Sequence, residues 1–196
     1  MSASTPITDG EAATQEPEYH RKFGSRSSAL EVNVDLSGKT ALVTGTTSGI
    51  GTETARALAL RGAHVVMAAR NILQSERVRD NILAERADAK LDLLNVDLSS
   101  LQSVRAAADE FLAKGWPLHI LILNAGVFAP VQKSTIDGHE STFAVNHLAH
   151  FYLTKLLLPR LRESAPSRVV IVSSDLHAKT GVRILLLFRM QCDKSE

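Results

Sequence analysis

Short apolar runs rich in β-branched residues alternate with longer amphipathic segments from residue 39 onward. The runs cover residues 40–44, 64–69, 91–96, 118–123 and 168–173. Between them, the segments at about 49–61, 74–86, 101–114 and 138–163 repeat apolar residues three and four apart, which predicts helices with one face on a sheet. The alternation predicts an α/β fold with a doubly wound parallel sheet of five strands.

The two ends of the chain differ from this pattern. Residues 1–36 are rich in Ser, Thr, Pro and Glu and predict a disordered tail, whereas residues 37–181 form the predicted domain. The segment 182–196 is first apolar and then polar, and we expect a divergent tail without a further strand or crossover helix. The fifth strand would then be an unpaired edge, so we expect that the later strands of the domain are missing.

Composition and charge narrow the classes of function. With 196 residues, 44% of them hydrophobic, the chain is long enough to bury a core. Its net charge of +1 favours neither a nucleic acid nor an anionic membrane as partner. The single cysteine, Cys192, excludes an internal disulfide, indicates no metal cluster and fits a reducing, cytoplasmic location. We expect no signal peptide and no transmembrane segment, since no run approaches about 20 apolar residues.

A glycine-rich motif lies where the first predicted strand ends and the first helix begins. It reads Thr-Gly-Thr-Thr-Ser-Gly-Ile-Gly over residues 44–51. Glycines let the backbone approach a pyrophosphate, which the amides and dipole of the helix N-terminus stabilise. An ordinary tight turn is the alternative. The candidate cofactor-binding residues of this motif are Thr44, Gly45, Ser48, Gly49, Ile50 and Gly51.

The end of the second predicted strand bears on the choice of cofactor. An acidic residue about twenty residues after the glycines would bind the ribose hydroxyls of NAD. Here the chain has Arg70 and Asn71 instead. A guanidinium suits the 2′-phosphate of NADP(H), so we expect that cofactor unless Arg70 is simply a solvated surface charge.

Two further motifs follow the third and fourth predicted strands. They are Val96-Asp97-Leu98 and Leu123-Asn124-Ala125-Gly126. Together with the glycine motif they resemble the short-chain dehydrogenase/reductase family over residues 35–177. The resemblance implies a Rossmann-type fold in which Asp97 and Leu98 border the adenine, while Asn124, Ala125 and Gly126 hold the central strand and line the cofactor cleft. By its position alone, Asp97 also fits an N-cap of the next helix.

Within this family, the resemblance is strongest to the branch of WW domain-containing oxidoreductase and the retinol dehydrogenase-type enzymes. It rests on residues 29–32, 62–66, 146–153 and 164–170. A WW domain needs paired tryptophans, and this chain has only Trp116. We therefore expect no WW domain.

The family resemblance also implies a catalytic tetrad of Asn, Ser, Tyr and Lys. Asn146 matches the asparagine that holds a water in a proton relay, and Ser174 matches the serine that hydrogen-bonds the substrate oxygen. Taken alone, Asn146 also fits a residue that satisfies helix backbone groups, and Ser174 a strand-end hydroxyl. The family's Tyr-x-x-x-Lys motif is absent, because no tyrosine follows Tyr152. We expect Tyr152 to serve in packing.

The resemblance implies an oxidoreductase that transfers hydride between NADP(H) and an alcohol or carbonyl substrate of lipophilic character. Without the tyrosine and lysine, we expect impaired or absent turnover and weaker cofactor binding. We expect no family-type dimer, since the helix that would pair with the 138–163 helix lies in the part expected to be missing. The alternatives are a non-catalytic dinucleotide-binding or regulatory splice product, and an unstable fragment.

Overall fold

The computed structural model describes residues 27–128, 133–174 and 190–192. The chain divides into two compact units, Met1–Val32 and Asn33–Glu196. In the first unit, the described residues include a turn in which the Glu31 amide donates to the Ser28 carbonyl at 3.1 Å. The second unit contains every strand and helix of the described residues. Of the disordered tail predicted over residues 1–36, residues 1–26 lie outside the described residues.

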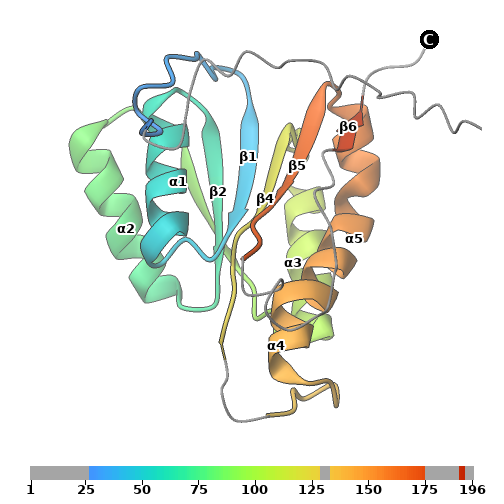
Figure 1. Ribbon diagram of the computed structural model, residues 1–196. Helices are drawn as coiled ribbons and strands as arrows, with labels where there is room; N and C mark the ends of the chain where they lie inside the picture. The colour runs from blue at the N-terminus through green and yellow to red at the C-terminus, as the bar shows by residue number, and fades with distance from the viewer. Residues whose placement is uncertain (1–26, 129–132, 175–189, 193–196) are drawn as a thin grey trace, which may run out of the picture. The chain divides into compact units, whose positions relative to one another are not determined.

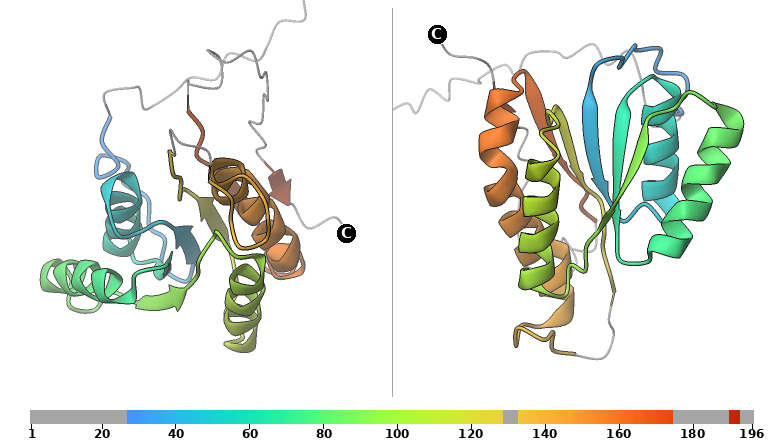
Figure 2. Two further views of the ribbon diagram at one scale, coloured as in Figure 1. Left: turned by 90° about the horizontal axis from the view of Figure 1, so that it is seen from below. Right: turned by 180° about the vertical axis from the view of Figure 1, so that it is seen from behind.

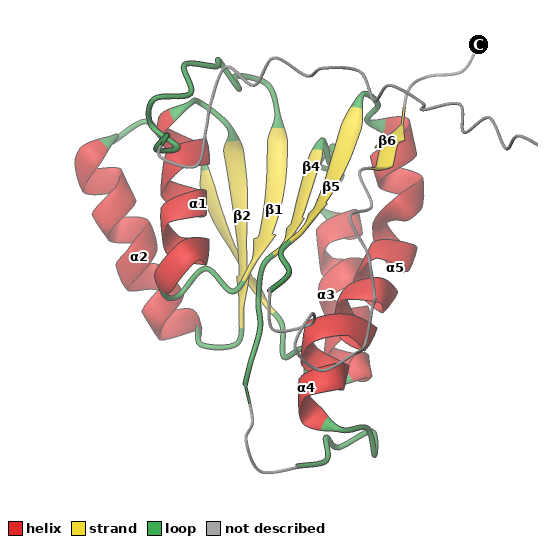
Figure 3. Ribbon diagram, viewed as in Figure 1, coloured by secondary structure: helices red, strands yellow, loops and turns green. Residues whose placement is uncertain are grey.

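A six-stranded sheet forms the centre of the second unit, with strand order β3-β2-β1-β4-β5-β6 (Figures 1 and 3). The strands are β1 (Thr40–Thr44), β2 (His64–Ala69), β3 (Leu91–Asn95), β4 (Ile120–Leu123), β5 (Ser167–Ile171) and β6 (Met190–Cys192). The first five pair in parallel, which confirms the predicted doubly wound sheet.

The strand β6 corrects one expectation. It pairs antiparallel with β5, with Val169 opposite Met190 and Ser167 opposite Cys192. The prediction that no strand follows β5, and that β5 is an unpaired edge, was therefore wrong. A strand of three residues is too short to show an alternating pattern, so hydrophobic periodicity could not reveal it.

The helices are α1 (Gly49–Leu60), α2 (Ile72–Glu85), α3 (Leu101–Ala113), α4 (Ser141–Phe143), the π-helical turn η1 (Ala144–Leu148) and α5 (Ala149–Glu163). The last three occupy the segment that was predicted as one helix from residue 138. That helical segment begins at Ser141 instead, because Gly138 has a φ of 79° and lies in a turn. The Glu140 carboxylate then accepts from the amides of Phe143 and Thr142, which start the helix and lower the pKa of Glu140.

Two hydrophobic layers lie on opposite faces of the sheet. Neighbouring residues of β1 point to different layers: Leu42 packs with Phe111 of α3 and Leu153 of α5, whereas Val43 packs with Ile82 of α2. Figure 2 shows the helix pairs α1–α2 and α3–α5 on opposite sides of the strands. Burial on both faces explains why the central strands are almost entirely apolar.

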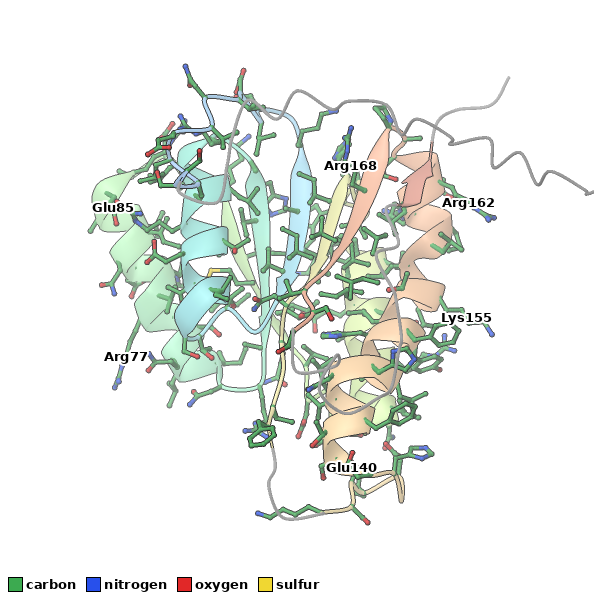
Figure 4. All side chains as sticks on the ribbon, viewed as in Figure 1. Arg77, Glu85, Glu140, Lys155, Arg162 and Arg168 are labelled. Atoms are coloured by element: carbon green, nitrogen blue, oxygen red, sulfur yellow. The ribbon has the colours of Figure 1, made fainter. Side chains whose placement is uncertain are left out.

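The outer faces of the helices carry charged side chains. Figure 4 shows Arg77 and Glu85 on α2, and Lys155 and Arg162 on α5, pointing away from the sheet. Among the described residues, no helix is both long and apolar enough to cross a membrane.

Candidate functional site

The candidate site lies at the carboxyl ends of the parallel strands. β1 pairs with β2 on one side and with β4 on the other, and the chain reverses its direction of winding between them. Open α/β sheets bind ligands in the crevice at such a switch point. A cavity of about 390 Å³ lies here, lined by residues that follow β1, β2, β3 and β4.

Most of the predicted cofactor-binding residues line this one cavity. They are Gly45, Ser48, Ile50, Gly51, Arg70, Asn71, Asp97, Leu98, Asn124, Ala125 and Gly126. Thr44 and Gly49 are not among its lining residues. The sequence motifs left out Val127 and Val145, two lining residues whose apolar side chains carry no chemical signal of their own.

The glycines of the motif have different physical roles. Gly45 has a φ of 74°, and a Cβ there would lie 2.8 Å from the Cα of Ala125. A Cβ at Gly51 would overlap the carbonyl oxygen of Gly45 and come within 2.5 Å of the Asn124 side-chain nitrogen. These two glycines therefore let protein segments pack closely, whereas a Cβ at Gly49 would meet open space.

The N-terminus of α1 borders the cavity and lacks a side-chain cap. Ser48 is the N-cap residue, but its side chain makes no capping hydrogen bond, and the first turn carries no acidic side chain. The helix dipole and the first-turn amides together favour an anion. Since Ser48 and Ile50 line the cavity, this end of it suits a phosphate group.

Arg70 and Asn71 directly follow the carboxyl end of β2. Arg70 is exposed and makes no ion pair with any residue that the structure describes. The Asn71 side-chain oxygen accepts from the Gln74 amide at 3.0 Å and caps α2. Arg70 is thus the charged group available to a ligand at this side of the cavity.

The Asp97 side chain is held by the turn that follows β3. Its Oδ1 accepts from the amide and the hydroxyl of Ser99 at 2.9 and 2.7 Å. The N-cap of α3 is Ser100, which accepts from the Ser103 amide. The alternative interpretation of Asp97 as the cap was therefore wrong, because Ser100 caps α3; Asp97 contacts the first turn through its amide instead, which donates to the Ser103 hydroxyl at 2.9 Å.

Thr44 joins the ends of β1 and β4 beneath the cavity. Its side chain is fully buried, and its Oγ1 accepts from the amides of Asn124 and Ala125 at 2.9 and 3.0 Å. The Asn124 side chain in turn donates to the Thr44 carbonyl at 2.9 Å. These bonds fix the segment that forms one wall of the cavity.

The two candidate catalytic residues lie on η1 and after β5. The Asn146 side chain bonds the backbone of Val127 twice, accepting from its amide at 2.8 Å and donating to its carbonyl at 2.9 Å. Ser174 is exposed, three residues beyond the end of β5. Tyr152 packs against the core, and its hydroxyl accepts from the Arg105 side chain at 3.0 Å, which confirms its predicted packing role.

The profile of the family described as short chain dehydrogenase matches residues 39–184. The chain belongs to the short-chain dehydrogenase family. The match begins one residue before β1 and includes the glycine motif, the cavity, Asn146 and Ser174.

Curated relatives and solved structures agree with this assignment. The chain is 46% identical to WW domain-containing oxidoreductase of Gallus gallus over 169 residues, covering 85% of this chain and 41% of the relative. It is 50% identical to retinol dehydrogenase 12 of Mus musculus, covering 83% and 51%. The RhlG/NADP active-site complex of Pseudomonas aeruginosa has a TM-score of 0.59 and 32% identity, covering 69% and 54%. The chain thus spans about half the length, or less, of these proteins.

Proposed function

We propose that this chain binds a nicotinamide dinucleotide in the cavity at the carboxyl ends of the strands β1 to β4, and that it prefers NADP(H) to NAD(H). One observation carries this proposal: the uncapped N-terminus of α1 and the exposed Arg70 border the same cavity. A pyrophosphate would bind at the first and the adenosine 2′-phosphate at the second. The NADP complex of the structural neighbour RhlG supports the choice.

We further propose the family reaction, hydride transfer between the cofactor and a lipophilic alcohol or carbonyl compound. The bound nicotinamide would supply or accept the hydride. The Ser174 hydroxyl would hydrogen-bond the substrate oxygen. Both polar atoms of the Asn146 amide are bound to Val127, yet each keeps one lone pair or one N–H with which to hold a water.

The proposed reaction also needs a proton donor, and the tyrosine nearest to the family motif does not match it. Tyr152, which has a lysine three rather than four residues after it, is bound to Arg105. We therefore propose that turnover by these residues is impaired. A non-catalytic dinucleotide-binding protein is the second candidate, favoured by the contrast between a well-formed cavity and an absent Tyr-x-x-x-Lys motif.

Titration with NADPH and, in parallel, with NADH tests the cofactor proposal. The readouts are the fluorescence of the cofactor and energy transfer to it from Trp116. Arg70→Asp should weaken NADPH binding about 10- to 100-fold, as expected for loss of a charged hydrogen bond, and leave NADH binding unchanged or tighter. Arg77→Asp on the outer face of α2 is the matched control and should change neither (Figure 4). An unchanged NADPH/NADH ratio in Arg70→Asp would overturn the preference, and no binding of either cofactor would overturn the site.

Assays of turnover separate the two candidate functions. NADPH oxidation with lipophilic aldehydes and ketones, lost in Ser174→Ala, would support the enzyme. Saturable binding without turnover would support the binding protein. A non-cooperative thermal transition by circular dichroism would instead support the unstable fragment.

A further inference from the structure

A buried histidine contacts both Thr44, which holds one wall of the cavity, and η1, which carries Asn146. His150 is 4% exposed and lies on α5, just after η1. Its Nε2 is 3.0 Å from the Thr44 hydroxyl oxygen, and its Nδ1 is 3.4 Å from the Asn146 carbonyl. None of the roles proposed above uses this side chain.

The hydrogen bonds of Thr44 determine which nitrogen of His150 carries the proton. The Thr44 oxygen already accepts from the amides of Asn124 and Ala125, so both of its lone pairs are occupied. Its one hydrogen must then be donated. His150 Nε2 at 3.0 Å is a better acceptor than the Ile122 carbonyl at 3.5 Å. Nε2 is therefore unprotonated, and the ring proton is on Nδ1, directed at the Asn146 carbonyl.

We propose that His150 is a positioning residue of the dinucleotide site, acting as a neutral imidazole that orients the Thr44 hydroxyl and links it to η1. Through Thr44 it holds the amides of Asn124 and Ala125, and through η1 it acts on Asn146, which holds Val127. The contacts through Thr44 and the contacts through Asn146 both fix residues 124–127, which line the cavity. The effect on the cofactor rests on the proposed function, but the hydrogen-bond network does not.

The surroundings of His150 keep it neutral. Burial is the main cause that lowers the pKa of His150 to about 4. The hydrogen bond to the Asn146 carbonyl opposes this shift, and the charge of His147, the smallest effect, adds to it. At neutral pH the ring can therefore accept from Thr44 as the network requires.

Three variants test the role through cofactor binding. His150→Phe fills the space but cannot accept from Thr44, and it should weaken NADPH binding about tenfold. His150→Gln offers an amide oxygen to the same hydroxyl and should stay within about threefold of the unchanged protein. His147→Gln, an exposed histidine on η1, is the control and should bind normally. Equal loss in His150→Phe and His150→Gln, or no loss in either, would overturn the role.

A readout without cofactor separates this inference from the proposed function. Long-range ¹H–¹⁵N NMR of the unchanged chain should show His150 protonated at Nδ1 and bare at Nε2. The amides of Asn124 and Ala125 should exchange faster in Thr44→Val than in Thr44→Ser. A proton on Nε2, or equal exchange, would overturn the inference even if NADPH binds. The expected tautomer without any cofactor binding would overturn the proposed function alone, and these measurements also decide the case if His150→Phe does not fold.

Discussion

Two strands of the sheet, β1 and β5, are built very differently. All five residues of β1 are buried, and two glycines that follow the strand pack closely on the end of β4: Gly45 on Ala125 and Gly51 on Asn124. In β5, Ser167 and Val169 are buried, whereas Val170 and Ile171 are 44% and 37% exposed. The β1 side, where the cofactor is proposed to bind, is thus held by close backbone contacts. The β5 side leads to an exposed Ser174.

This contrast separates the two parts of the proposed function. Apart from the exposed Arg70, the proposed binding residues include several that are fixed by partners, such as Asn124 and Ala125, whose amides donate to Thr44. The residues proposed for chemistry include a serine on an exposed segment and lack a Tyr-x-x-x-Lys motif. The proposed binding and the proposed turnover therefore rest on different residues, and they need separate measurements.

The largest expected effect is the loss of stability when Gly51, which packs near the end of β1, is replaced. Gly51→Ala should lower the free energy of unfolding by more than about 3 kcal/mol, because its Cβ would overlap a backbone oxygen that cannot move away. Urea unfolding followed by circular dichroism measures this loss. Gly115→Ala is the control: its φ of 69° adds backbone strain of about 1–2 kcal/mol, but its Cβ would meet no atom. Equal losses in the two variants would contradict the packing role of Gly51.

Acid should lower the stability of the folded chain by protonating His150, which contacts Thr44 at the end of β1. Because burial lowers its pKa from 6.5 to about 4, the unfolded chain binds a proton in this range that the folded chain does not. Stability should be complete above about pH 6.5 and fall by about 3 kcal/mol as the pH drops to 4. Urea midpoints across this range measure the loss, which His150→Gln should largely remove. A small remainder is expected from His119, whose pKa is lowered by burial and by Lys39.

The smallest effects sharpen the comparison of the two strands directly. Val43→Thr in β1 buries a hydroxyl at a fully buried position and should cost about 1–3 kcal/mol. Val170→Thr in β5, where the side chain is 44% exposed, should stay within about 0.5 kcal/mol. Thermal unfolding of both variants gives the two values. Similar costs would mean that the two strands are equally well packed.

The sequence was informative where the chemistry is local. The five parallel strands follow from continuous apolar runs that are covered on both faces, and their bounds agree within two residues. The gathering of the glycine motif, Arg70 and Asn124 at one cavity follows from their common position after parallel strands. In both cases the pattern in the sequence is itself the physical cause.

Other features depend on contacts between distant residues. The turn η1 differs from an α-helix in its backbone bonding, which leaves the spacing of apolar side chains nearly unchanged. The partner of His150 is Thr44, 106 residues away, so nothing near His150 indicates its role. The sequence motif places Gly51 in a phosphate-binding turn, and its close packing against Gly45 and the Asn124 side chain could not be predicted from that motif.

The pairing of β1 with β4 also determines when the cleft can form. Thr44 and Asn124 are 80 residues apart, and β2 and β3 lie between them in the sequence. Contacts of such long range close late and slow the folding of a domain. During synthesis, the segment up to β3 can build one half of the sheet, but it has no cofactor wall. The ability to bind a dinucleotide would therefore report that β4 has joined the sheet.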